Sequence, residues 1–188
     1  VVGDATGKGM PAALVMASAR STLRALAQSS ESPGDVMRRA NDPLFIDIPA
    51  NMFVTCFYAI FEPKSGRLRY ANAGHDLPYL HRTSGEAEEL RATGMPLGLM
   101  PGMRYEEKQT TLKAGEAALF YSDGIVEAHN PKGRMFGFPK LKALVAKYGQ
   151  EQSLGDLLLE ELYSFAGEGW EQEDDITLLT LRRSATRS

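Results

Sequence analysis

The chain has 188 residues, of which 43% are hydrophobic and 24% charged, and this is enough for a globular domain with a sizeable core. Its net charge of −3 lacks the basic excess typical of nucleic-acid binding, so we expect no nucleic-acid partner. The single cysteine, Cys56, excludes a disulfide within the chain and favours a reducing, cytoplasmic setting. We expect one domain over residues 1–183, followed by a flexible tail over residues 184–188.

The first part of the chain is expected to contain a strand end and two helices. Val1 and Val2 run into Gly3-Asp4, and a glycine-rich turn leads to Pro11, which suits the first position of a helix. That helix is expected to reach about Gln28. A second helix is expected to have its N-cap at Ser32 and its first position at Pro33, and to end near Pro43, because proline disrupts a helix interior.

The rest of the chain alternates between strand patterns and helix patterns. The expected strands are residues 52–61, 67–72, 77–81, 105–112 (a looser alternation), 117–122 and 176–181. Cys56 lies in the first of these and is expected to be buried. Helices are expected over residues 139–148 and 154–165. Strands in consecutive hairpins with helices in separate blocks indicate an α+β fold with antiparallel sheets.

Carboxylates stand at three junctions between an apolar strand and a loop. Asp4 follows Val1-Val2-Gly3, Asp123 follows the apolar run 117–122, and Asp174 with Asp175 precedes the run 176–181. If these side chains converge, a divalent cation offsets their repulsion, and oxygen ligands favour Mg²⁺ or Mn²⁺ over Zn²⁺. The alternative is that these are ordinary Asp-containing loops, and patterning alone leaves both open.

Five motifs occur in a defined order, and together they are specific although each alone is weak. They are Gly3-Asp4-Ala5-Thr6-Gly7-Lys8-Gly9-Met10-Pro11-Ala12-Ala13, Met52-Phe53-Val54-Thr55, Asn72-Ala73-Gly74-His75, Ser122-Asp123-Gly124 and Asp174-Asp175-Ile176-Thr177. In these motifs the chain resembles bacterial metal-dependent serine/threonine phosphatases of the PPM superfamily. The branch is the stage II sporulation protein E-like one, which includes stress-response phosphatases. The likeness covers nearly the whole chain.

The resemblance implies a sandwich of two antiparallel β-sheets flanked by helices, with two Mn²⁺ or Mg²⁺ ions. By matched position, Asp4 would bridge both ions and the backbone carbonyl of Ala5 would join one of them. Asp123 and Asp174 would complete the protein ligands of the other ion. These three carboxylates would be the catalytic set, and a metal-activated water would attack the phosphorus in line.

The resemblance also implies a substrate and partners. The substrate would be a phosphoserine or phosphothreonine on an anti-sigma-factor antagonist in a partner-switching pathway. An upstream sensor or receiver domain is expected in the full-length chain, and a homodimer is a further expectation. The chain itself has no apolar stretch near the roughly 20 residues that span a bilayer, although the full-length protein could be membrane-tethered through its upstream domain.

The chain departs from the family pattern at several positions. Relatives carry a Gly-Gly-Asp-type motif upstream of the first strand, and this chain starts after it. We therefore expect the second metal site to be incomplete and the N-terminal strand to be missing. Thr6 stands where related eukaryotic enzymes place a histidine, which leaves water on the metal as the acid for the leaving serine. Asp76 stands where an asparagine is common, and no role is assigned to it.

Two other functions stay open. One is a catalytically weak regulatory module that binds the same partner, and the other is a hydrolase of a small phosphate monoester. Lys8 could bind the substrate phosphate or be a solvated lysine. His75 is expected to bond nearby backbone rather than to take part in chemistry. His81 and His129 are expected at the surface.

Overall fold

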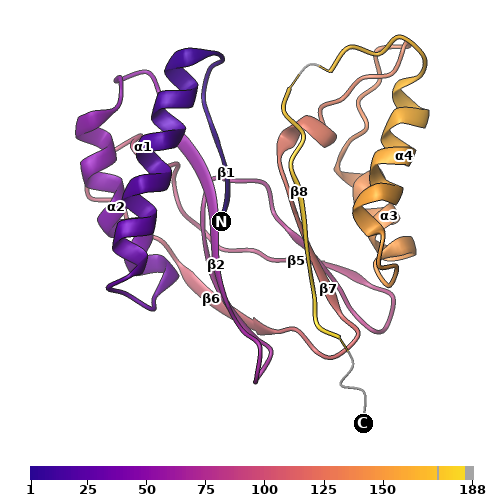
Figure 1. Cartoon of the computed structure of the whole chain (residues 1–188), viewed down its shortest axis with the longest axis horizontal. Helices are drawn as coiled ribbons and strands as arrows, with labels where there is room; N and C mark the ends of the chain where they lie inside the picture. The colour runs from indigo at the N-terminus through magenta and orange to yellow at the C-terminus, as the bar shows by residue number, and fades with distance from the viewer. Residues whose placement is uncertain (173, 185–188) are drawn as a thin grey trace. The chain divides into compact units, whose positions relative to one another are not determined.

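The computed structural model describes residues 1–172 and 174–184, and these form two compact units that are interleaved in the sequence (Figure 1). Unit 1 contains Val1–His75 and Arg91–Thr111, and unit 2 contains Asp76–Leu90 and the chain from Leu112 onward. Each unit has a four-stranded antiparallel sheet and a pair of α-helices, which confirms the predicted α+β class. Except for Ser184, the predicted tail lies outside the described residues, and the single-domain expectation stays a prediction.

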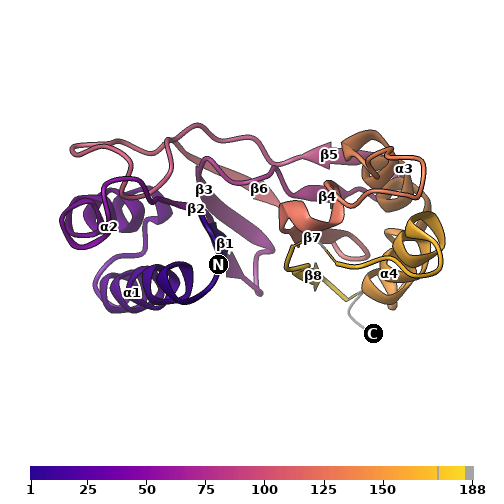
Figure 2. The same cartoon turned by 90° about the horizontal axis from the view of Figure 1, so that it is seen from above.

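Unit 1 carries two helices on one face of its sheet. Its elements are β1 (Val2–Ala5), α1 (Met10–Ala27), α2 (Pro33–Asp47), β2 (Val54–Glu62), β3 (Arg67–Ala73) and β6 (Glu107–Thr111), and the strand order is β1-β2-β3-β6. Helices α1 and α2 lie side by side in both views (Figures 1 and 2). Their buried side chains, including Leu23 and Met37, join Cys56 and Ala71 of the sheet in one hydrophobic core. This burial stabilises the sheet that contains β1, the strand that carries Asp4.

Unit 2 also has four strands and two α-helices, but they follow one another in a different order along the chain. They are β4 (Tyr79–His81), β5 (Ala87–Glu89), β7 (Ala117–Tyr121), the short 3₁₀ helix η1 (Asp123–Ile125), α3 (Phe138–Tyr148), α4 (Leu154–Ala166) and β8 (Leu178–Arg182), and the strand order is β5-β4-β7-β8. All five residues of β7 are buried, as its continuous apolar run predicts. Leu141 of α3 and Leu158 and Leu162 of α4 pack in the core beside Tyr121. Because β7 is central, the turn after it is held on a rigid support.

Helix α2 does not end at Pro43, so that prediction was wrong. The cap at Ser32 is confirmed, since its Oγ accepts a hydrogen bond from the Asp35 N–H at 3.1 Å. The helix continues through Pro43 to Asp47 because Leu44 and Ile48 are both buried, and the Ile48 N–H donates to the Leu44 carbonyl at 3.0 Å. Burial of this last apolar turn outweighs the hydrogen bond that proline cannot make.

Strand β5 and His81 also differ from expectation. No strand is apparent in the sequence at Ala87–Glu89, and it forms because the turn after β4 brings it back beside that strand, with the Arg82 N–H donating to the Glu86 carbonyl at 2.8 Å. His81 is 2% exposed, not at the surface, because β4 lies between β5 and β7 and Gly149 packs against the imidazole ring. His129 is only partly exposed, and its Nδ1 is buried.

The two remaining sequence expectations concern Cys56 and the membrane. Cys56 is a free, buried thiol, as its position in an apolar strand predicts. Burial raises its pKa to about 12. Within the ranges 1–172 and 174–184, none of the helices combines the length and the apolar character needed to cross a bilayer.

Candidate active site

Asp4 lies in unit 1 near the end of β1, where the strand passes into the glycine-rich turn. It pairs with Thr55 of β2, and the next residue, Ala5, pairs with Val54. The Thr6 side chain fixes the exit from the strand, since its hydroxyl accepts from the Phe53 N–H at 2.8 Å and donates to the Phe53 carbonyl at 3.1 Å. This bracing holds Asp4 and Ala5 in a defined position ahead of α1.

The turn after Ala5 needs glycine at two positions. Gly7 and Gly9 have φ of 91° and 76°, which is the left-handed region that other residues rarely adopt. Lys8 lies between them and is exposed. The turn therefore places a cationic side chain four residues beyond Asp4, at the surface of unit 1.

His75 is part of a buried polar network that also involves the Asp4 backbone. The Thr55 hydroxyl lies 2.9 Å from His75 Nδ1 and 3.4 Å from the Asp4 carbonyl oxygen. The Asn72 side chain bonds both backbone groups of His75, accepting from its N–H and donating to its carbonyl, each at 2.8 Å. His75 is 7% exposed. Its backbone is thus bonded by the Asn72 side chain, and its ring contacts the Thr55 hydroxyl. The network supports the β1 end.

Asp123 lies in unit 2, directly after the buried strand β7, at the start of η1. Its carbonyl accepts hydrogen bonds from the Val126 and Glu127 N–H groups, both at 2.9 Å, and these bonds close the turn. Among the described residues, no hydrogen bond or ion pair engages the Asp123 carboxylate. The backbone of Asp123 is thus held by hydrogen bonds, whereas its carboxylate is available to bind a ligand.

The structure brings the Asp123 turn and the Asp174–Asp175 segment together. The Ser122 hydroxyl donates to the Asp175 carbonyl and accepts from the Thr177 N–H, both at 2.9 Å. Gly124 packs so closely that a Cβ there would lie 2.5 Å from the Asp175 carbonyl oxygen. The two motifs that contain Asp123 and Asp174 are therefore hydrogen-bonded neighbours, as the hypothesis of converging carboxylates within unit 2 requires.

Asp76 is a further candidate site residue, to which the sequence analysis assigns no role. Its Oδ2 is buried and has no hydrogen-bond partner among the described residues. Burial, together with the nearby charges of Asp123 and Glu127, raises the pKa of Asp76 to about 6. The signals available in the sequence were its place directly after the Gly74-His75 motif and the departure from the asparagine that is common there. The charge of Asp123 therefore acts on a further carboxylate, that of Asp76.

The donors present are suited to a hard divalent cation. Carboxylate oxygens are the ligands that Mg²⁺ and Mn²⁺ prefer, and the unpartnered Asp76 oxygen is the kind of orphaned buried acceptor that a cation satisfies. Over residues 1–172 and 174–184, no group of three His, Cys, Asp or Glu side chains is assembled to hold a metal. Asp4 belongs to unit 1, whereas Asp123 and Asp174 belong to unit 2, and each is described within its own unit.

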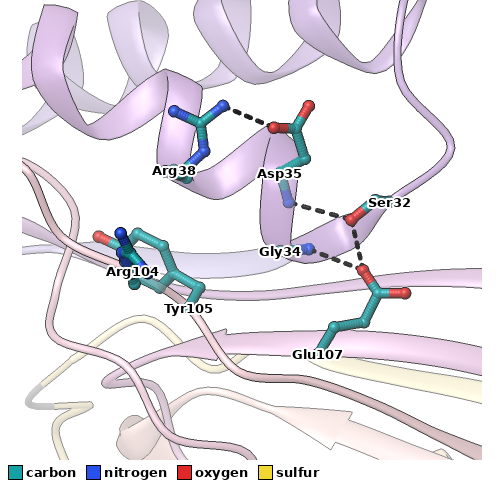
Figure 3. Close-up of a pocket in the computed structure, with 7 residues that line it drawn as sticks. All are labelled: Ser32, Gly34, Asp35, Arg38, Arg104, Tyr105 and Glu107. Carbon is teal, nitrogen blue, oxygen red and sulfur yellow. Dashed lines mark hydrogen bonds and ion pairs between the residues drawn. The ribbon is translucent and has the colours of Figure 1, made fainter.

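A separate pocket of about 510 Å³ lies in unit 1 and contains none of the predicted site residues (Figure 3). It is lined by the start of α2, Arg104, Tyr105 and Glu107 of β6. The Glu107 carboxylate accepts from the Ser32 hydroxyl and the Gly34 N–H, and Arg38 pairs with Asp35 at 2.7 Å. The positive end of α2 is thus already occupied by a carboxylate of the protein itself.

Comparison with protein families gives one match over almost the full chain. The family described as stage II sporulation protein E matches residues 1–184. The phosphoserine phosphatase RsbU of Bacillus subtilis is 28% identical over 185 residues, which cover 97% of this chain and 54% of that protein. Protein IcfG of Synechocystis is 29% identical over 213 residues, covering 98% of this chain and 33% of that protein. The chain therefore spans between a third and about half of the length of these two relatives.

Among solved structures, one relative joins two kinds of domain. The RsbU and RsbW domains of Rv1364c from Mycobacterium tuberculosis superpose with a TM-score of 0.83 and 26% sequence identity. The match covers 99% of this chain and 53% of that one. A match of this extent includes residues of both units.

Proposed function

Because the chain belongs to the stage II sporulation protein E family, we propose that it is a metal-dependent protein phosphatase that hydrolyses phosphoserine or phosphothreonine. The observation that carries the proposal is the hydrogen-bonded pairing of the Asp123 turn with the Asp174–Asp175 segment. RsbU is named a phosphoserine phosphatase, and it aligns with 97% of this chain. The family match and this geometry point to the same chemistry.

In the proposed site, Asp4, Asp123 and Asp174 hold Mn²⁺ or Mg²⁺, with the backbone carbonyl of Ala5 as a further ligand. The bound cation would supply an activated water as nucleophile and neutralise charge that develops on the phosphoryl oxygens. The residues of this chain hold the ligands in place: Ser122 ties the Asp123 turn to Asp175, and Thr6 and Thr55 brace the β1 end. Asp175 acts through its backbone carbonyl and is a positioning residue. Lys8 would contact the substrate phosphate from the turn after Ala5.

The protein substrate proposed is a phosphorylated anti-sigma-factor antagonist in a partner-switching pathway. Support comes from the relatives, since RsbU aligns with nearly the whole chain and the mycobacterial structure contains an RsbU domain together with an RsbW domain. An upstream sensor or receiver domain would regulate the phosphatase in the full-length protein.

The direct test is turnover of p-nitrophenyl phosphate and of a phosphoserine peptide with and without Mn²⁺. Activity should appear with Mn²⁺ and vanish with excess chelator. Replacing Asp123 by Asn should lower kcat by about 10³-fold or more, because phosphoryl transfer depends on the electrostatic elements around the phosphate. Asp156→Asn, at an exposed position in the first turn of α4, is the matched control and should keep normal activity.

The same assay separates the enzyme from a binding module. A folded Asp123→Asn protein with near-normal turnover would contradict the assigned role of Asp123. A wild-type chain that binds a phosphorylated peptide with Mn²⁺ present, but does not hydrolyse it, would favour the catalytically weak regulatory module instead.

A further inference from the structure

A basic hairpin precedes α3 in unit 2, and nothing in the proposed chemistry uses it. Residues 129–135 contain Lys132 and Arg134 and no Asp or Glu, and Lys140, Lys142 and Lys147 follow in α3, in a chain whose net charge is −3. His129 and Met135 form an antiparallel bridge, so residues 129–135 are a tight hairpin. We name residues 129–135 together with Phe138 the basic hairpin surface.

The tip of the hairpin is preorganised by one side chain. The Asn130 Oδ1 accepts hydrogen bonds from the N–H groups of Lys132 and Arg134, both at 3.0 Å. The backbone closes the same turn, since the Gly133 N–H donates to the Asn130 carbonyl at 2.8 Å. A hairpin held in this way presents its side chains at little entropic cost on binding.

The side chains that it presents are available to a partner. Lys132 and Arg134 are exposed and make no ion pair with any residue in the described part of the chain. Met135 follows Arg134 directly and is 52% exposed, and Phe138 at the start of α3 is 48% exposed. Arginine, methionine and phenylalanine are enriched at protein–protein interfaces, so the mixture suits a protein partner.

The root of the hairpin is buried and is joined to the Asp123 turn. Phe136 is 3% exposed and packs edge-on against Phe165 of α4, with the Lys140 ammonium over both rings. The Phe136 N–H donates to the Ala128 carbonyl at 2.8 Å, and the Gly137 N–H donates to the Val126 carbonyl at 2.9 Å. Val126 in turn donates to the Asp123 carbonyl. A short chain of hydrogen bonds thus connects the hairpin with the proposed metal ligand.

We propose that the basic hairpin surface is a docking site for an acidic face of the phosphoprotein substrate, outside the phosphoserine itself. The inference rests on the proposed phosphatase function. An acidic protein is favoured over a membrane or a nucleic acid because Gly167 packs against Pro131 of the hairpin and begins the loop that contains Glu168, Glu171 and Asp174. An extended polyanion would meet these carboxylates, whereas a compact acidic face could contact the hairpin alone.

The test compares two synthetic 20-residue phosphoserine peptides, one with Asp and Glu flanks and one with Ser and Asn flanks, and p-nitrophenyl phosphate. The double variant Lys132→Glu/Arg134→Glu should lower kcat/KM for the acidic peptide about tenfold, mainly through KM, by reversing two exposed charges. It should leave p-nitrophenyl phosphate and the uncharged peptide unchanged. Met135→Ser should weaken the acidic peptide several-fold. The control Arg20→Glu/Lys64→Glu reverses two exposed charges in unit 1 and should change none of the three substrates.

Three outcomes would overturn the proposal. One is unchanged kinetics of the double variant on the acidic peptide, and another is an equal loss on p-nitrophenyl phosphate, which would mean damage to the site. The third is hairpin-dependent binding to phosphatidylglycerol-containing vesicles or to a 20-base-pair DNA duplex without an effect on the peptides. If the wild-type chain with Mn²⁺ hydrolyses none of the substrates, the proposed function fails by itself. Fluorescence anisotropy of the labelled acidic peptide then decides docking, which requires weaker binding by the double variant than by the control.

Discussion

The close contact at Gly124 allows the proposed site to be disturbed without removing any of its charges. A Cβ at this position would lie 2.5 Å from the Asp175 carbonyl oxygen and 3.3 Å from that of Asp174, whereas ordinary contacts are at 3.4–4 Å. In Gly124→Ala, the Asp174–Asp175 backbone must therefore move away from the Asp123 turn by about 0.9 Å, because a Cβ atom cannot lie 2.5 Å from a carbonyl oxygen. The substitution changes the spacing of two proposed metal-binding segments and little else.

The expected effects follow from that displacement. A shift of about 1 Å in a catalytic arrangement costs on the order of 100-fold, so kcat/KM for p-nitrophenyl phosphate should fall by about that factor. Mn²⁺ affinity measured by titration calorimetry should weaken in parallel. Overpacking should lower the free energy of unfolding by only about 1–3 kcal/mol, so the protein should still fold.

Gly155→Ala is the matched control for this substitution. A Cβ at Gly155 meets no atom within 4 Å, and the residue lies in the first turn of α4. Alanine there should be neutral or stabilise the helix by up to about 1 kcal/mol. A folded Gly124→Ala protein with wild-type Mn²⁺ affinity and turnover would refute the reasoning, because it would show that the spacing of the two segments is irrelevant to the site.

Two further predictions concern buried groups away from the site. Burial alone would raise the pKa of Glu116, but hydrogen bonds from the Lys113 N–H and the Arg82 guanidinium outweigh it and lower the pKa. Glu116→Gln should therefore reduce the free energy of unfolding by about 2–3 kcal/mol at pH 7, measured in urea titrations. This difference should shrink as the pH falls through the lowered pKa of Glu116, because the native carboxylate then becomes protonated. An equal deficit at low pH would contradict the assignment. The pKa of Cys56 is raised to about 12, so the thiol should react with iodoacetamide at pH 8 about 10³-fold more slowly in the native protein than in urea. Mass spectrometry follows the labelling. Rapid labelling of the native protein would show that the strand of Cys56 opens readily.

Local pattern was sufficient to predict most of the regular structure. The apolar run before Asp123 predicts a central buried strand, and β7 is buried at every residue. The Ser32-Pro33 pair predicts the start of α2, because capping and proline preferences act within one turn. The same local reasoning failed at Pro43, where burial of Leu44 and Ile48, a tertiary effect, extends the helix.

The sequence by itself determined which residues are candidates for the chemistry: the order of the motifs singles out Asp4, Asp123 and Asp174. Only the tertiary structure decided how the unit 2 candidates are held, since the bonds from Ser122 to Asp175 and Thr177 join segments more than fifty residues apart. Tertiary structure also decided the environment of Asp76, because burial and the charge of Asp123 come from chain segments that local pattern does not relate to it. A motif shows which side chains are present, whereas their desolvation and mutual distance depend on packing between distant parts of the chain.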